Sequence, residues 1–143
     1  MRKLMRLHRK QIHVEWGDCD PAGIVYFPRY FEYFDACTNA LFESAGLPKP
    51  ELLRRYGIMG IPLVEAQARY IAPSSFGDTV LVETCITEWK NSSFRVEHKL
   101  YRGEILAVEA TEVRVWTVRI GSDPKLIESR PIPREVIERF KDS

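Results

Sequence analysis

Hydrophobic and polar side chains follow two different periods along the chain, and the first is helical. From Pro28 to Ala45, the apolar side chains gather on one side when successive residues are projected about 100° apart. The members of this arc are Tyr30, Phe31, Phe34, Cys37, Ala40, Leu41, Phe42 and Ala45. Pro28 suits the start of a helix, and Gly46 and Pro48 suit its end. So broad an apolar arc predicts one long helix with a sheet wrapped around it.

A period of two residues, typical of β-strands, governs most of the remaining chain. The strand patterns lie at residues 11–16, 63–71, 78–89, 93–101 and 105–118. Short helices are predicted at residues 50–57 and after Pro133. The connections between strands are short, which favours an antiparallel meander. We therefore expect a single α+β domain over residues 1–143, with an antiparallel sheet of about five strands packed on one long helix.

Composition narrows the classes of function. Hydrophobic residues make up 45% of the chain, and 21 basic side chains nearly balance 20 acidic ones, so no strong field points to nucleic acid or a charged membrane. The basic N-terminus lacks the apolar segment of a secretory signal, and no apolar run could span a bilayer. Cys19, Cys37 and Cys85 lack metal-binding spacing and fit free thiols in a reducing cytoplasm. With three scattered histidines, this pattern argues against a metal site.

The segment from Gly17 to Tyr30, GDCDPAGIVYFPRY, sets two carboxylates at a chain bend directly before the long helix. Its motif reads Asp18-x-Asp20-x-x-Gly23-x-Val25-Tyr26-Phe27-x-x-Tyr30. In front of a helix and a strand meander, this motif resembles the hotdog-fold acyl-CoA thioesterases, most closely the 4-hydroxybenzoyl-CoA thioesterase family. The similarity covers nearly the whole chain and includes GLP after the helix and ETCITEW in a later strand.

The resemblance implies a hotdog fold, in which the sheet wraps the long helix and two subunits join their sheets edge to edge. It implies hydrolysis of an acyl-CoA thioester at sites between subunits, in a homotetramer built as a dimer of hotdog dimers. It implies neither a metal nor a bound cofactor, because coenzyme A is part of the substrate. We accordingly expect a cytoplasmic enzyme with a small-molecule acyl-CoA substrate and with no nucleic-acid or membrane partner.

Thioester hydrolysis needs a group that attacks the carbonyl or activates water, and a donor for the developing oxyanion. No histidine lies in a nucleophile motif, so a carboxylate is the remaining candidate. The resemblance assigns Asp20 as nucleophile or general base and the Phe27 amide as the group that polarises the carbonyl. Gly23 would let the backbone approach the acyl group. The structural alternative is that Asp20 only caps a turn, and Asp18 is expected to bond backbone in the loop.

The candidate substrate-binding residues are Asp35, Tyr26 and Lys90. By resemblance, Asp35 matches a position that contacts the ring hydroxyl of a hydroxybenzoyl group. Its alternative is a helix-margin aspartate that is solvated or pairs with an arginine. Lys90 follows the Trp89 of ETCITEW, where the family holds nucleotide phosphates with basic residues; Asn91 and Ser92 depart from that basic pattern.

Other functions remain open at this point. The broader motif also serves short-chain aliphatic acyl-CoA and acyl-carrier-protein thioesterases, so an aromatic acyl group is a hypothesis. A hotdog dehydratase would need a histidine near the helix, and none lies between His13 and His98. From another class, the chain could be a non-catalytic module that binds acyl thioesters. Release of free thiol from acyl-CoAs distinguishes an enzyme from such a module.

Overall fold

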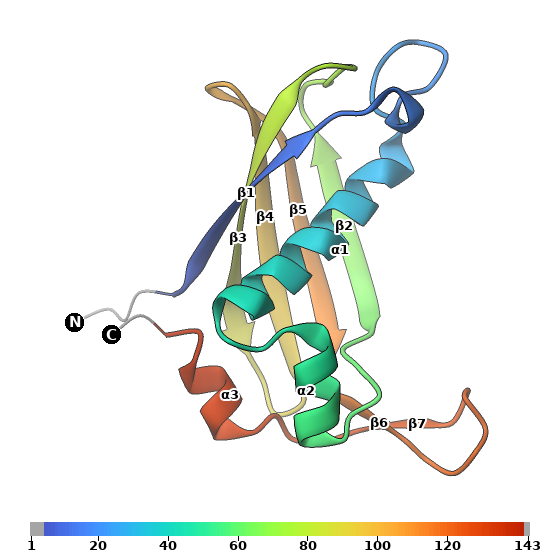
Figure 1. Ribbon diagram of the computed structural model, residues 1–143, viewed down its shortest axis with the longest axis vertical. Helices are drawn as coiled ribbons and strands as arrows, with labels where there is room; N and C mark the ends of the chain where they lie inside the picture. The colour runs from blue at the N-terminus through green and yellow to red at the C-terminus, as the bar shows by residue number, and fades with distance from the viewer. Residues whose placement is uncertain (1–4, 142–143) are drawn as a thin grey trace.

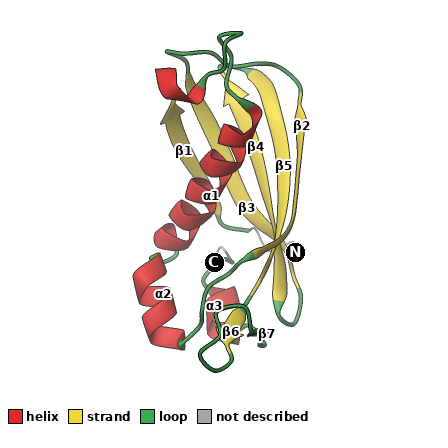
Figure 2. Cartoon of the chain, turned by 90° about the vertical axis from the view of Figure 1, so that its right-hand side faces the viewer, coloured by secondary structure: helices red, strands yellow, loops and turns green. Residues whose placement is uncertain are grey.

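A curved antiparallel sheet wraps around one long helix in the computed structural model, which describes residues 5–141 (Figure 1). The strands are β1 (Leu7–His13), β2 (Leu63–Tyr70), β3 (Thr79–Trp89), β4 (Ser93–Arg102) and β5 (Ile105–Val115), in the order β1-β3-β4-β5-β2. Every neighbouring pair is antiparallel. The central helix α1 (Phe27–Ser44) lies across one face of this sheet (Figure 2). The predicted α+β architecture is therefore confirmed.

The core forms between α1 and the inward side chains of the strands. Strand alternation places Val82, Val96 and Leu100 on the inner face, where all three are fully buried. The buried residues of α1 are Tyr30, Tyr33, Phe34, Cys37, Thr38, Leu41 and Phe42. Burial of a large apolar side chain contributes about 1.5–3 kcal/mol, so this contact supplies most of the force that holds α1 on the sheet.

The predicted apolar arc of α1 differs from the buried face in a few positions. Phe31 and Ala40 are only half-buried, whereas the polar residues Tyr33 and Thr38 are buried. Both hydroxyl groups find hydrogen-bond acceptors inside the fold, which removes the cost of burying them. Apolarity alone could not have indicated these two positions.

The ends of α1 follow the predicted signals closely. The helix begins at Phe27, with Pro28 at its second position, and the chain leaves it through Gly46 at a φ of +80°. Helix α2 (Lys49–Tyr56) follows and ends at Gly57, as the pattern predicts. None of the helices within residues 5–141 is long and apolar enough to cross a membrane.

The prediction of one continuous strand over residues 105–118 is wrong. Strand β5 stops at Val115, and the buried Trp116, whose ring centroid lies 5.5 Å from that of Tyr56 in α2, separates it from the next strand. A separate two-stranded sheet then forms from β6 (Thr117–Arg119) and β7 (Ile127–Ser129). Helix α3 (Arg134–Glu138) follows Pro133, as expected.

Candidate active site

The loop before α1 is a tight, internally bonded turn. The Asp20 N–H donates to the Ile24 carbonyl at 2.9 Å, and the Gly23 N–H donates to the Asp20 carbonyl at 2.9 Å. Gly23 has a φ of +84°, a conformation that side-chain-bearing residues rarely adopt. A Cβ on Gly23 would meet no other atom of the described chain within 4 Å, so its backbone angle, not crowding, calls for glycine.

Asp20 is half-buried, and its carboxylate uses one of its two oxygens within the described chain. Oδ1 accepts the Ala22 N–H at 2.8 Å, which is the turn-capping bond that the structural alternative requires. Among residues 5–141, no donor pairs with the other oxygen, Oδ2. The turn thus orients the carboxylate and leaves one oxygen available, so Asp20 can cap the turn and still act on a substrate.

A cavity of about 430 Å³ opens beside this carboxylate. The turn, the first residues of α1 and the chain at the end of β2 enclose it, and its lining residues are Asp20, Ile24, Val25, Phe27, Tyr30, Tyr70, Ile71, Ala72 and Pro73. Asp20 is the one carboxylate in this lining. Burial raises the pKa of both Tyr30 and Tyr70, so the two phenols stay neutral at physiological pH. The cavity is therefore a mostly apolar space with a single acidic group.

The N-terminus of α1 meets the same cavity. Tyr26 is the N-cap residue, its side chain makes no capping hydrogen bond, and its ring is half exposed against Phe27 at 5.4 Å. In the part of the chain that the structure describes, no acceptor pairs with the Phe27 N–H. Free amides at a helix start carry partial positive charge, which attracts an electron-rich oxygen. The structure thus brings Asp20 and the amide end of α1 to one space.

Asp18 holds the base of the turn, as expected of a structural residue. Its Oδ2 accepts the Glu15 N–H at 3.0 Å and the Tyr33 hydroxyl at 2.8 Å. Its carbonyl accepts the Tyr26 N–H at 2.8 Å, which fixes the entry to α1. Burial and the bond to Asp18 raise the pKa of Tyr33, so its hydroxyl remains a donor. Tyr33 therefore ties the Asp20 turn to the helix behind it.

Asp35 lies outside the lining of this cavity, farther along α1. Its side chain is 55% exposed, and Oδ1 accepts a hydrogen bond from Nη2 of Arg114 at 2.8 Å. Within the chain, the structure therefore shows the arginine pairing that the sequence left as an alternative. The predicted contact between Asp35 and an acyl group involves a ligand and stays a prediction.

A buried polar network behind Asp35 was missed by the sequence reasoning. Glu112 is 2% exposed, and it accepts hydrogen bonds from Arg114 at 2.9 Å and Thr38 at 2.8 Å. His98 stands 3.3 Å from Glu112 through Nε2 and 2.8 Å from Thr84 through Nδ1. Strand alternation was the available signal, because it places His98, Glu112 and Arg114 on the inward face with aliphatic neighbours.

Lys90 lies at the other end of the sheet from the cavity. It follows β3 in the tight β3–β4 turn, at the lower end of the sheet in Figure 1, whereas α1 begins at the upper end. Its ammonium group is exposed and stands 3.6 Å from Glu88. A single chain therefore does not bring Lys90 to Asp20.

Burial disfavours the thiolate form of two of the three cysteines. All three are free thiols, and burial raises the pKa of Cys37 to about 12 and also raises the pKa of Cys85. Cys19 is half-buried, and its sulfur lies 3.7 Å from the Glu15 carbonyl. Within residues 5–141, no group of three or more His, Cys, Asp or Glu side chains could hold a metal ion.

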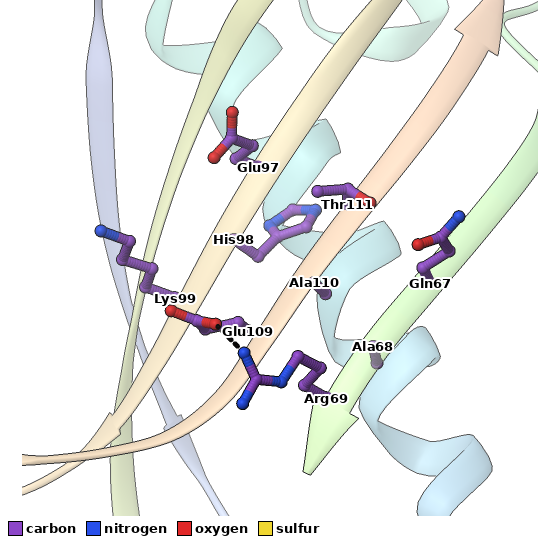
Figure 3. A pocket seen from close by; sticks show the side chains of 9 residues that line it. All are labelled: Gln67, Ala68, Arg69, Glu97, His98, Lys99, Glu109, Ala110 and Thr111. Atoms are coloured by element: carbon purple, nitrogen blue, oxygen red, sulfur yellow. Dashed lines mark ion pairs between the residues drawn. The ribbon is translucent and has the colours of Figure 1, made fainter. Parts of the chain in front are cut away.

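A second hollow, of about 250 Å³, lies over β2, β4 and β5 (Figure 3). Both acidic and basic side chains line it, and Arg69 pairs with Glu109 at 3.8 Å. The residues that line this hollow all belong to strands, so it has no free amides of a helix start to polarise a carbonyl. The cavity beside Asp20 is therefore the stronger candidate.

Comparison with known proteins identifies the family. Residues 14–140 match the thioesterase-like superfamily. The chain is 38% identical over 135 residues to the 4-hydroxybenzoyl-CoA thioesterase of Pseudomonas sp. strain CBS-3, covering 90% of this chain and 93% of that protein. An aspartate-to-asparagine mutant of 4-hydroxybenzoyl-CoA thioesterase, solved with 4-hydroxybenzoyl-CoA, aligns with a TM-score of 0.85 and 33% identity over 94% of this chain and 99% of that one. A gentisyl-coenzyme A thioesterase aligns with a TM-score of 0.79 and 32% identity over 93% and 98%. The chain therefore belongs to the thioesterase-like superfamily, as a hotdog-fold acyl-CoA thioesterase related to the 4-hydroxybenzoyl-CoA thioesterases.

Proposed function

We propose that this enzyme hydrolyses an acyl-CoA whose acyl group is a hydroxylated aromatic ring, with Asp20 as nucleophile or general base. The observation that carries the proposal is the cavity in which the free oxygen of Asp20 and the amide end of α1 meet. Two relatives support the acyl group, since their names give 4-hydroxybenzoyl-CoA and gentisyl-CoA as substrates.

The chemistry follows from the two groups. The Phe27 N–H would donate to the thioester oxygen and stabilise the negative charge that develops there, a contribution of about 2.7–4 kcal/mol for one such donor. Oδ2 of Asp20 would either attack the carbonyl carbon, giving a mixed anhydride that water hydrolyses, or take a proton from an attacking water. In both routes the C–S bond breaks, coenzyme A leaves as a thiol, and the acid is released.

The dimensions of α1 support a role for Asp35 at the far end of the acyl group. Asp35 follows Phe27 by eight residues, which is about 12 Å along a helix axis. A para-hydroxylated benzoyl group with a hydrogen bond at each end spans a similar length. Phe31, half-buried between these two residues, offers an aromatic surface for the ring.

A second copy of the chain is part of this proposal. Strand β2 is an edge of the sheet, no other strand of the described chain covers its outer side, and Leu63, Val64 and Tyr70 on it are exposed. Such an edge favours pairing with a second β2 about a two-fold axis. That symmetry would turn the partner's sheet end for end, so the partner's Lys90 would lie at the same end of the joined sheet as this cavity. We extend this to a homotetramer of two such dimers, in the cytoplasm, where the three thiols stay reduced.

Thiol release from a panel of thioesters tests the proposed function. We expect 4-hydroxybenzoyl-CoA to be hydrolysed with a higher kcat/KM than benzoyl-CoA, and butyryl-CoA least efficiently, because the cavity is apolar and Asp35 can accept a hydrogen bond. A thiol-reactive dye follows the reaction. A preference for butyryl-CoA or for an acyl-carrier-protein thioester would support the aliphatic alternative. Saturable binding without thiol release would overturn the enzyme proposal.

Replacement of Lys90 tests the coenzyme end of the substrate. We expect Lys90→Ala to raise KM for 4-hydroxybenzoyl-CoA about two- to fivefold with kcat unchanged. An exposed lysine that binds a phosphate far from the thioester stabilises the ground state and the transition state equally. The effect should shrink at high salt. Lys125→Ala, on an exposed loop between β6 and β7, is the control. A lower kcat, or an unchanged KM, contradicts the assignment.

A further inference from the structure

We infer that Arg114 is a positioning residue for acyl-group recognition. It holds the Asp35 carboxylate in one orientation, so that the second oxygen of that carboxylate accepts a hydrogen bond from a ring hydroxyl. This inference rests on the proposed function, because it takes a hydroxylated aromatic acyl group as the substrate.

The guanidinium of Arg114 is fixed on three sides. Its side chain is 6% exposed and donates from Nε to Glu112 at 2.9 Å, from Nη1 to the Ile61 carbonyl at 3.1 Å and from Nη2 to Asp35 at 2.8 Å. These acceptors belong to β5, to the segment before β2 and to α1. A planar fork held by three separate parts of the fold leaves one direction for the bond to Asp35.

The anchor of Arg114 is itself rigid. Glu112 is buried and bonded to Thr38 and Arg114, and His98 lies between Glu112 and Thr84. The His98 ring stacks on Phe34 with a centroid distance of 4.8 Å. Packed interiors do not deform continuously, so Arg114 cannot follow a moving Asp35.

The charges leave Asp35 as an acceptor. The positive charge of Arg114 is balanced by the buried Glu112. Burial works to lower the pKa of Arg114, but the hydrogen bonds and charges of Glu112 and Asp35 raise it by more, so the guanidinium stays protonated. Within residues 5–141, Oδ2 of Asp35 has no hydrogen-bond partner, and the side chain is 55% exposed. An exposed carboxylate normally loses side-chain entropy when it binds a ligand. The buried guanidinium already restricts the Asp35 side chain, so less entropy remains to be lost on binding.

A merely structural role for Arg114 predicts a different result from a positioning role. If Arg114 only stabilised the fold, its loss would affect all acyl-CoA substrates alike. If it orients Asp35, its loss should act on substrates that bear the hydroxyl, because a site built to bond a hydroxyl discriminates strongly against analogues that lack it. The ratio of kcat/KM for 4-hydroxybenzoyl-CoA to that for benzoyl-CoA separates the two roles.

The test compares this ratio in the wild type, Asp35→Asn, Arg114→Met, Arg114→Lys and the double variant Asp35→Asn with Arg114→Met. We expect Asp35→Asn and Arg114→Met each to lower the ratio at least tenfold, and the double variant to lower it no further than either alone. Arg114→Lys keeps the charge beside Glu112 and carries the test if Arg114→Met does not fold; it should lower the ratio as well, because an ammonium lacks the planar fork. Arg9→Met removes an exposed arginine paired with Glu83 at 2.8 Å on the β1 side of the sheet, and should leave the ratio unchanged.

Three other outcomes of this test would reject the positioning role of Arg114. If Asp35→Asn lowers the ratio and Arg114→Lys does not, Arg114 is not a positioning residue, and the proposed function stands. If Arg114→Met lowers kcat/KM equally for both substrates, its role is structural and the inference is overturned. If Asp35→Asn leaves the ratio unchanged, the inference falls together with the hydroxylated-substrate part of the proposed function, whereas hydrolysis that still depends on Asp20 would preserve the thioesterase mechanism.

Discussion

Asp20→Asn should lower kcat for thioester hydrolysis by about 10²–10⁴-fold, the range typical of a lost acid–base group, while the fold and substrate binding are retained. The amide oxygen of asparagine can still accept the Ala22 N–H that Oδ1 accepts at 2.8 Å, so the turn keeps its shape. The amide nitrogen then occupies the position of the free oxygen, and it neither attacks a carbonyl nor takes a proton from water. Thiol release under saturating acyl-CoA measures kcat, and a thermal melt verifies the fold.

A matched control separates loss of chemistry from loss of a turn cap. Asp123 makes the same capping bond in the exposed loop between β6 and β7, where its Oδ1 accepts the Lys125 N–H at 2.9 Å, and it does not line the cavity. Asp123→Asn should therefore leave kcat within about twofold of the wild type, since surface changes away from a site have small effects. Unchanged turnover in Asp20→Asn would refute the catalytic role of Asp20 and leave turn capping as its function.

The sequence predicted the elements that depend on local signals. The long apolar arc, Pro28 and Gly46 are all read within a few residues of one another, and they indicated α1 to within one residue at each end. Strand alternation likewise indicated the sheet, but the first strand was placed wrongly at residues 11–16: β1 covers Leu7–His13, and a short 3-10 helix begins at Trp16. The cavity could be anticipated in part because Asp20 and Phe27 are close along the chain, so a turn directly before a helix must bring them together.

Features that depend on contacts between distant residues could not be predicted. Glu112 lies 74 residues from Thr38 and 14 from His98, and nothing local indicates that these three side chains satisfy one another inside the core. Asp35 shows the same limit, because its partner Arg114 is 79 residues away. For Lys90, a similarity of motif gave no information on which end of the sheet it occupies.

Removal of the carboxylate at the centre of the buried network should have the largest effect on stability. We expect Glu112→Ala to lower the free energy of unfolding by about 3–5 kcal/mol, since it removes the buried charge partner of Arg114 and leaves the guanidinium only the exposed carboxylate of Asp35. Chemical denaturation at pH 7, followed by circular dichroism, measures the change. Glu109→Ala is a control from the same strand, because Glu109 lies at the surface, 3.8 Å from Arg69, and should cost less than about 1 kcal/mol. Equal losses in the two variants would contradict a special role for the network.

The pH dependence of this loss tests the charge on Glu112 directly. Burial works to raise the pKa of Glu112, but the hydrogen bonds and charges of His98 and Arg114 more than offset it and hold the pKa below its ordinary value of 4.5. Because the pKa is lower in the folded than in the unfolded chain, the ionised carboxylate stabilises the fold fully above about pH 4.5, and this contribution disappears as the pH falls through the folded value. Glu112→Gln has the same shape without the charge. The difference in unfolding free energy between the wild type and Glu112→Gln should therefore be constant above that pH and shrink on further acidification. A difference that grows on acidification would mean that burial dominates and that the carboxyl group is protonated inside the folded protein.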